Sequence, residues 1–166
     1  MSAVDASFLL PDWPAPANVR ALATTRQGGV SRGPYASFNL ALHIGDDHAA
    51  VQQNRQRLAQ RLPASPLWLE QVHACSVADA DSASGTPQAD AAVARQPQKI
   101  CAVLSADCLP VLFCDDQGRV VAAAHAGWRG LAGGVLETTM EAMRVAPERL
   151  LAWLGPAIGP RAFEVG

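Results

Sequence analysis

Short apolar runs joined by few residues are the feature of this sequence that most limits its fold. Three of them, at 100–105, 111–114 and 120–125, have the length and composition of buried strands. The dipeptide Gln117-Gly118 separates the second run from the third and is typical of a hairpin turn. Links of hairpin length favour antiparallel pairing. We therefore predict an α+β fold with mixed, largely antiparallel sheets.

Two helices are expected among these strands. Asp46 and Asp47 precede a segment with apolar residues on one helical face, which predicts a capped helix over 48–62 that ends before Pro63. A Gly-rich turn at 127–134 is expected to lead into a second helix over 135–145. The other segments predicted to form strands are 19–25, 36–44, 67–73, 76–80 and 150–154.

The length and charge of the chain exclude several classes of protein. Its 166 residues fit a single domain, and its 13 basic and 15 acidic side chains give a formal net charge of −2. No positive field is present to hold nucleic acid non-specifically. The longest uncharged stretch, 33–45, is too short and too polar to span a membrane, and the N-terminus lacks the pattern of a secretory signal. We expect a cytoplasmic protein whose four cysteines are reduced.

One cysteine and two histidines are expected at the C-terminal edges of apolar strands. His73 ends WLEQVH, Cys108 follows SAD, and His125 ends VVAAAH. Together they could supply the three ligands of a catalytic zinc, with a fourth position open for water or substrate. The same residues could instead form a Cys nucleophile with an activating His. Their spacing matches no compact zinc motif, so three separate core residues are a third interpretation.

Polar neighbours of these runs are candidates to support a metal ligand or to contact a substrate. Asp107 could be a buried carboxylate behind one of the histidines or a residue of a turn. Arg129 could bind an anion such as phosphate or stack on Trp128, and Arg26 is a second candidate for anion binding. The amides Asn39 and Gln71 could contact a substrate, or could serve the structure.

Six motifs occur along the chain in the order TTRQGGVS, FNLALHIGDD, LEQVH, ADCLPVLF, AAAHAGWRG and WLGPAIGP. In this set and order the sequence resembles the YfiH family of bacterial proteins, which are also catalogued as laccase-like multicopper polyphenol oxidoreductases and are relatives of the mammalian protein FAMIN. The resemblance departs at Ala74, where the family usually has Gly, and at GPRAF, where a Cys-containing version is more familiar. Family members continue further, so the resemblance implies a single domain over 1–166 that lacks its C-terminal part.

The resemblance implies a zinc site made by His73, Cys108 and His125. It also implies a layered α/β/β/α fold with a topology related to Cys-His hydrolase-like toxins. Activities reported for the family are phosphorolysis of purine nucleosides, including methylthioadenosine, and deamination of adenosine. Other members are described as editing factors for peptidoglycan precursors, and older descriptions give copper polyphenol oxidation.

We therefore expect a zinc-dependent purine nucleoside phosphorylase, with adenosine, inosine or methylthioadenosine and phosphate as substrates and with adenosine deaminase activity. Zinc suits deamination, for which Asp107 could move protons. A Cys- or zinc-dependent amidohydrolase that edits peptidoglycan precursors is the main alternative, followed by a noncatalytic binding module. A copper polyphenol oxidase (laccase) ranks low, because that chemistry uses several His-rich copper sites and the chain has four His.

Overall fold

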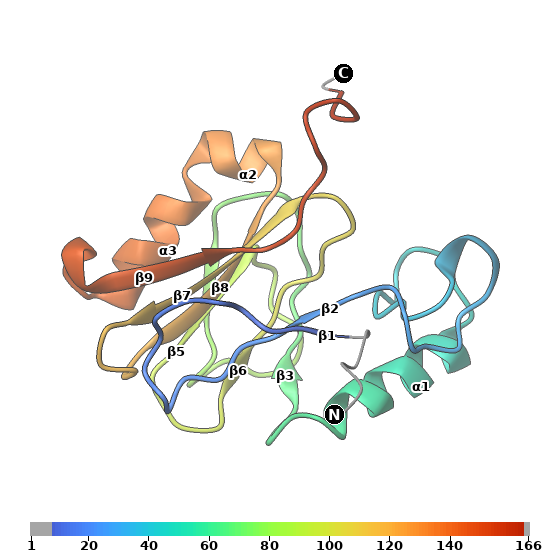
Figure 1. Cartoon of the computed structure of the whole chain (residues 1–166), viewed down its shortest axis with the longest axis horizontal. Helices are drawn as coiled ribbons and strands as arrows, with labels where there is room; N and C mark the ends of the chain where they lie inside the picture. Colours follow the sequence, from blue (N-terminus) through green and yellow to red (C-terminus); the bar gives the residue numbers. More distant parts are fainter. Residues whose placement is uncertain (1–7, 165–166) are drawn as a thin grey trace. The chain divides into compact units, whose positions relative to one another are not determined.

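The structure is a computed structural model that describes residues 8–164 (Figure 1). The chain divides into two compact units. Unit 1 comprises Met1–Pro11 and Ala21–Ser65, and unit 2 comprises Asp12–Arg20 and Pro66–Gly166. Two compact units can belong to one folding domain, so the single domain over 1–166 stays a prediction.

Unit 2 is built on a five-stranded sheet with the strand order β4-β5-β8-β7-β9. All neighbours in it are antiparallel except β4 and β5, and a separate parallel pair is formed by β3 and β6. The predicted α+β fold with mixed, largely antiparallel sheets is thus confirmed. The strands are β3 (Pro66–Leu67), β4 (Val77–Asp79), β5 (Ala91–Ala94), β6 (Ile100–Cys101), β7 (Leu109–Asp115), β8 (Val121–Ala126) and β9 (Leu150–Leu154).

The predicted hairpin lies at the centre of this sheet. β7 and β8 pair from Leu109↔Ala126 to Cys114↔Val121. Gly118 in the connecting turn has φ +65°, a left-handed conformation that glycine adopts without steric cost. The buried carboxylate of Asp115 closes the turn by accepting hydrogen bonds from the backbone N–H groups of Arg119 (2.6 Å) and Val120 (3.1 Å).

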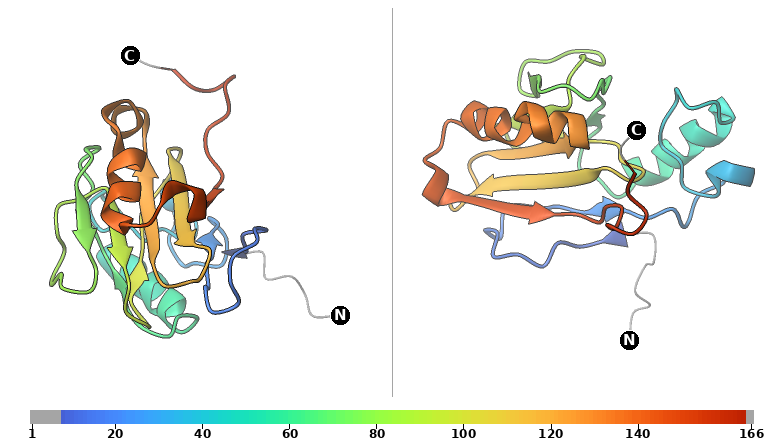
Figure 2. Two further views of the ribbon diagram at one scale, coloured as in Figure 1. Left: turned by 90° about the vertical axis from the view of Figure 1, so that its left-hand side faces the viewer. Right: turned by 90° about the horizontal axis from the view of Figure 1, so that it is seen from above.

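Two helices, α2 (Trp128–Gly133) and α3 (Val135–Met143), lie on one face of the sheet, as both views in Figure 2 show. α3 buries Val135, Thr139 and Met143, which are spaced one helical turn apart and therefore share a face. This face packs against β8 and β5, where small alanines let the helix approach closely. A 3₁₀ turn, η2 (Pro147–Arg149), leads from α3 into β9.

Unit 1 contains the strands β1 (Phe8–Leu9) and β2 (Ala23–Thr24), the 3₁₀ turn η1 (Gly33–Tyr35) and the helix α1 (His48–Ala59). The predicted cap is confirmed, because the Asp47 side chain accepts hydrogen bonds from the N–H groups of Ala49 and Ala50. The helix ends three residues before the predicted position. After Gln60 the pattern tightens, because the N–H groups of Arg61 and Leu62 bond to the carbonyl oxygens of Leu58 and Ala59, three residues back.

The strand predicted over 36–44 is wrong, because side chains take the hydrogen bonds that a neighbouring strand would make. Arg26 donates to the carbonyl oxygen of Ala36 through Nε (2.9 Å) and Nη2 (2.6 Å). The amide of the buried Asn54 donates to the carbonyl oxygens of Ser37 (3.2 Å) and Asn39 (2.9 Å). The segment is therefore a looped structure held by side chains.

The strand predicted over 67–73 is largely wrong as well. Only Pro66–Leu67 belongs to a strand, and Glu70 makes a single bridge to Gln88. The Gly-rich segment 127–134 forms the helix α2 where a turn was predicted, and β5 was not predicted at all. Three of the four residues of β5 are alanine, which has low β propensity, and neighbouring strands rather than local preference specify it.

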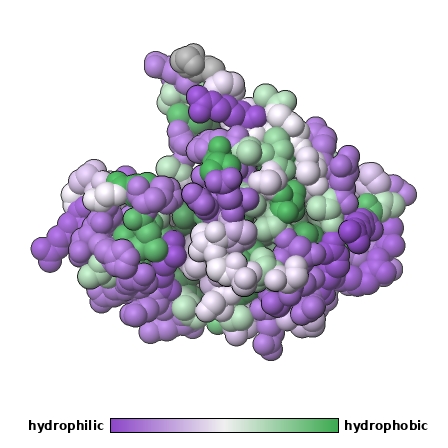
Figure 3. All heavy atoms as spheres, turned by 180° about the vertical axis from the view of Figure 1, so that it is seen from behind, coloured by the Kyte–Doolittle hydropathy of each residue, from purple (hydrophilic) through white to green (hydrophobic). Residues whose placement is uncertain are grey.

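The large apolar side chains of unit 2 that stay exposed include Val72, Trp128, Leu131, Leu154, Ile158 and Phe163. Figure 3 shows hydrophobic and hydrophilic residues side by side on the face seen from behind. No helix within residues 8–164 combines the length and the apolar character needed to cross a membrane.

Candidate metal centre

The pairing of β7 with β8 brings Cys108 beside His125. Leu109 pairs with Ala126 and Pro110 with His125, so Cys108, directly before Leu109, lies next to the end of β8. His125 is only 3% exposed, whereas Cys108 is half-buried. The register of the hairpin therefore places a sulfur and an imidazole at the same edge of the sheet.

His73 reaches the same place from an irregular loop. Its backbone has φ +59°, a left-handed conformation that typically costs a residue with a side chain about 1–2 kcal/mol. Such strain persists only where the surrounding structure holds it, and it concentrates at functional sites. The ring of His73 meets that of His125 edge to face, with centroids 4.8 Å apart.

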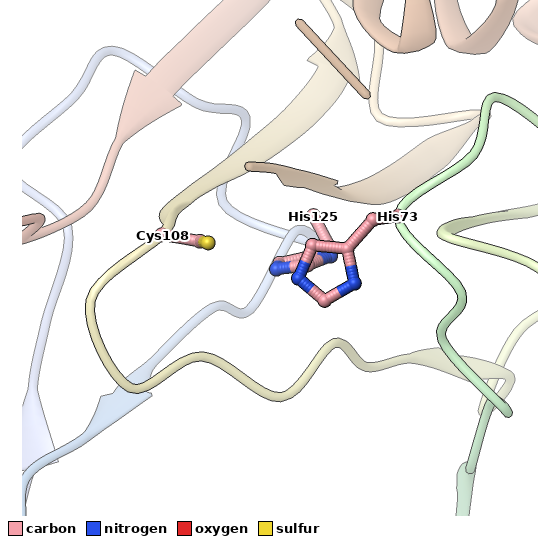
Figure 4. A group of neighbouring side chains, drawn as sticks. All are labelled: His73, Cys108 and His125. Atoms are coloured by element: carbon pink, nitrogen blue, oxygen red, sulfur yellow. The ribbon is translucent and has the colours of Figure 1, made fainter. Parts of the chain in front are cut away.

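The three side chains converge. One ligand atom from each of His73, Cys108 and His125 lies within 4.8 Å of the others. Figure 4 shows the Cys108 sulfur pointing toward the two imidazole rings. One thiolate and two imidazoles are a donor set that suits zinc with an open fourth position, and three-coordinate copper uses the same donors. The arrangement is a possible metal site.

Gly127 closes one side of this group. A Cβ added to Gly127 would lie 2.9 Å from the Cys108 sulfur and 3.2 Å from Cδ2 of His73. Only a glycine leaves these two side chains free to converge, and this supports the fit of a metal ion to the site.

We expect the substitution Gly127→Ala to weaken metal binding while leaving the fold intact, because the new methyl group displaces two ligands. Elemental analysis after dialysis should give less metal per chain than wild type. Gly159→Ala is the matched control, because nothing lies within 4 Å of the position that its Cβ would take. Gly85→Ala would not serve, since the φ of +69° at Gly85 strains any residue with a side chain. Full metal retention in Gly127→Ala would contradict this description of the site.

Asp90, directly before β5, lies behind the group and was not among the predicted site residues. Its side chain is fully buried, and its Oδ1 lies 2.9 Å from Nδ1 of His125. Burial by itself would raise the pKa of Asp90, but hydrogen bonds from His125 and from three backbone N–H groups outweigh it and lower that pKa. The sequence did offer a signal for Asp90, since it stands directly before four small apolar residues. A carboxylate next to a buried run needs hydrogen-bond partners, which makes it a candidate site residue.

Asp107 does not lie behind either histidine as a hydrogen-bond partner. It is exposed in the loop before Cys108, so the hypothesis of a buried carboxylate there is wrong, and Asp90 is the partner of His125. Burial raises the pKa of the Cys108 thiol, and the negative charge of Asp107 raises it further.

The other predicted contacts of unit 2 make local interactions. Both ends of the Gln71 amide bind the backbone of Leu104, through Nε2 to its carbonyl oxygen (2.8 Å) and Oε1 to its N–H (2.6 Å). The guanidinium of Arg129 lies 5.1 Å from the ring centroid of Trp128, which is the stacking alternative. Their substrate-binding roles stay predictions.

Arg26 and Asn39 belong to unit 1. Arg26 holds the carbonyl oxygen of Ala36, and Asn39 donates to Asp46 (2.9 Å) and accepts from the N–H of Ala41 (2.9 Å). All four cysteines are free thiols. Burial raises the pKa of Cys101 to about 12 and that of Cys114 to about 11, as expected for core thiols outside the metal site.

Known proteins resemble this chain over nearly its whole length. A purine nucleoside phosphorylase of Pseudomonas aeruginosa is 58% identical over 160 residues, covering 96% of this chain and 66% of the relative. The purine nucleoside phosphorylase YfiH of Escherichia coli is 54% identical over 165 residues, covering 96% of this chain and 67% of the relative. The chain thus spans about two thirds of the length of these relatives.

Solved structures agree with the fold. The crystal structure of a Neisseria meningitidis protein superposes with a TM-score of 0.91 at 56% identity, covering 96% of this chain and 66% of that one. YlmD from Geobacillus stearothermophilus superposes with a TM-score of 0.75 at 33% identity, covering 95% and 67%. The family described as multi-copper polyphenol oxidoreductase laccase matches residues 20–166. The chain therefore belongs to this family, the YfiH family that its motifs resemble.

Proposed function

We propose that this chain carries the zinc site of a purine nucleoside phosphorylase. The observation behind the proposal is the convergence of His73, Cys108 and His125 within 4.8 Å, in a chain whose close relatives are named purine nucleoside phosphorylases. The bound metal would supply Lewis-acid chemistry at an open coordination position. Adenosine, inosine and methylthioadenosine are the proposed nucleosides, and phosphate is the second substrate.

Other residues of the chain are proposed to orient the ligands, bind the substrates and transfer protons. Nδ1 of His125 is occupied by Asp90, so Nε2 is left as the ligand atom. We propose Arg129, in the helix that follows His125, as a contact of phosphate and Gln71 as a contact of the nucleoside, since a guanidinium group binds phosphate oxygens in pairs. Contacts of phosphate by Arg26 and of the nucleoside by Asn39 stay separate proposals for unit 1. The exposed carboxyl of Asp107, next to Cys108, is the proposed group for proton transfer, in phosphorolysis and in deamination of adenosine.

A Cys108 nucleophile, as in an editing amidohydrolase, has less support. An activated cysteine needs a lowered pKa, whereas burial and Asp107 raise that of Cys108. Binding of a metal replaces the thiol proton and turns the same sulfur into a ligand. These features favour the metal-ligand role.

The description of the family supports copper oxidation, but the number of candidate metal sites does not. Within residues 8–164, His73, Cys108 and His125 are the one group of three or more potential ligands that could hold a metal ion. Multicopper oxidation uses several copper ions. Oxygen consumption with a phenol and added copper should therefore stay at background.

Phosphate dependence tests the proposed reaction. In phosphorolysis the bond between the base and C1′ of the sugar breaks, phosphate oxygen bonds to C1′, and a proton goes to the base. We expect the purified chain to convert inosine and phosphate to hypoxanthine and ribose 1-phosphate in equal amounts. Removing the metal with a chelator should abolish this conversion, and zinc should restore it.

The same assay separates the alternatives. Base release that needs no phosphate indicates hydrolysis and contradicts phosphorolysis. Ammonia release from adenosine tests the deaminase activity, and it should be lost with the metal. Activity that survives complete metal removal would overturn the role of the metal site.

A further inference from the structure

One buried carboxylate joins two ligands that are far apart in the sequence. Oδ1 of Asp90 accepts a hydrogen bond from the N–H of His73 (2.9 Å) and contacts Nδ1 of His125 (2.9 Å). Oδ2 accepts from the N–H groups of Val72 (3.1 Å) and Ala74 (2.8 Å). The backbone of Asp90 adds another link, since its carbonyl oxygen accepts the N–H of His125 (2.7 Å).

We propose that Asp90 is the positioning residue of the metal centre, and that it fixes both imidazole ligands at once. It sets which nitrogen of His125 carries the hydrogen, and it holds the loop that presents His73. This inference rests on the proposed metal site and assigns a role to a residue that does not itself bind the ion.

The first effect follows from the donors around the carboxylate. Backbone N–H groups can only donate, so three of the four partners of Asp90 require it to be an acceptor. An ionised carboxylate has no hydrogen to donate, so the fourth partner, Nδ1 of His125, donates to it. A hydrogen on Nδ1 leaves the lone pair on Nε2, which is the form of histidine that binds a metal through Nε2.

The second effect concerns the irregular loop. Val72, His73 and Ala74 direct three consecutive N–H groups to one carboxylate, in place of a strand partner. This convergence stabilises the left-handed backbone of His73, whose φ is +59°. Loss of these three hydrogen bonds would therefore release the backbone that presents the His73 ring to that of His125.

The substitution Asp90→Asn tests both effects. The amide has nearly the same shape, but one oxygen becomes an NH₂ group that must face a donor. If it faces His125, the ring has to accept at Nδ1 and loses the Nε2 lone pair. If it faces the loop, two N–H groups lose their acceptor.

Asp115→Asn is the matched control. Asp115 is as buried as Asp90 and its side chain accepts two backbone N–H groups, but it ends β7 at the turn to β8, away from the ligand group. We expect both variants to melt earlier than wild type. The dissociation constant for zinc should rise about 10–100-fold in Asp90→Asn and stay within about threefold in Asp115→Asn.

Nitrogen-15 NMR of the metal-free wild-type chain gives a readout that does not depend on the variants. We expect neutral His125 to carry its hydrogen on Nδ1. A hydrogen on Nε2, or zinc binding by folded Asp90→Asn as tight as wild type, overturns the inference and leaves the proposed function standing. A wild-type chain that binds no zinc overturns the proposed function instead, while the hydrogen on Nδ1 remains measurable.

Discussion

Replacing Cys108 with alanine is expected to remove the metal from the protein. A catalytic zinc site uses three protein ligands, and the variant retains only the two imidazoles of His73 and His125. The sulfur also brings the one negative charge of the ligand set, since neither histidine is anionic when it binds a metal. Loss of an outer-shell partner alone weakens binding about 10–100-fold, so loss of a ligand should exceed about 100-fold.

Metal per chain should therefore fall from about one to about one tenth or less after dialysis, and phosphorolysis should fall with it. Cys101→Ala is the matched control, because Cys101 is another partly buried thiol of unit 2 that lies outside the ligand group. It should keep its metal, and its activity should stay close to that of wild type. Full metal content in Cys108→Ala would show that the ion binds elsewhere.

The ligand group could be predicted because each member borders a recognisable apolar run. Cys108 immediately precedes β7 and His125 lies in β8, and the turn at Gln117-Gly118 makes these two strands neighbours. Local pattern and turn chemistry are sufficient for this part of the fold. The resemblance to the YfiH family then connects His73, because the apolar run that it ends forms an irregular loop instead of the predicted strand.

Asp90 and the loop over 68–74 could not be predicted in the same way. Alternation of apolar residues indicated a strand at 67–73, but a side chain that follows far along the chain takes the backbone hydrogen bonds of residues 72–74. The strand predicted over 36–44 is wrong for the same reason, because the side chains of Arg26 and Asn54 bind its backbone carbonyl oxygens. Periodicity describes burial, and it does not show which partner a backbone N–H or C=O finds.

Replacing Asn54 with alanine is expected to destabilise unit 1 strongly. Asn54 is fully buried in α1, and its Oδ1 accepts the N–H of Val30 (2.9 Å). Its two amide hydrogens are shared among Ser31 Oγ (2.9 Å) and the carbonyl oxygens of Ser37 (3.2 Å) and Asn39 (2.9 Å). Each buried group left without a partner costs about 1–3 kcal/mol. We therefore expect a loss of about 3–5 kcal/mol in the free energy of unfolding.

Hydrogen exchange can locate this loss, because the N–H of Val30 depends directly on Asn54 and should exchange much faster in the variant. Gln53→Ala, at the exposed neighbouring position of α1, should stay within about 0.5 kcal/mol of wild type. Asn54→Asp sharpens the test, since a carboxylate can still accept from Val30 but cannot donate to the three other partners. If Asn54→Asp is as stable as wild type, the donated hydrogen bonds do not hold the 26–40 loop, and another interaction must keep Arg26 and Asn39 in place.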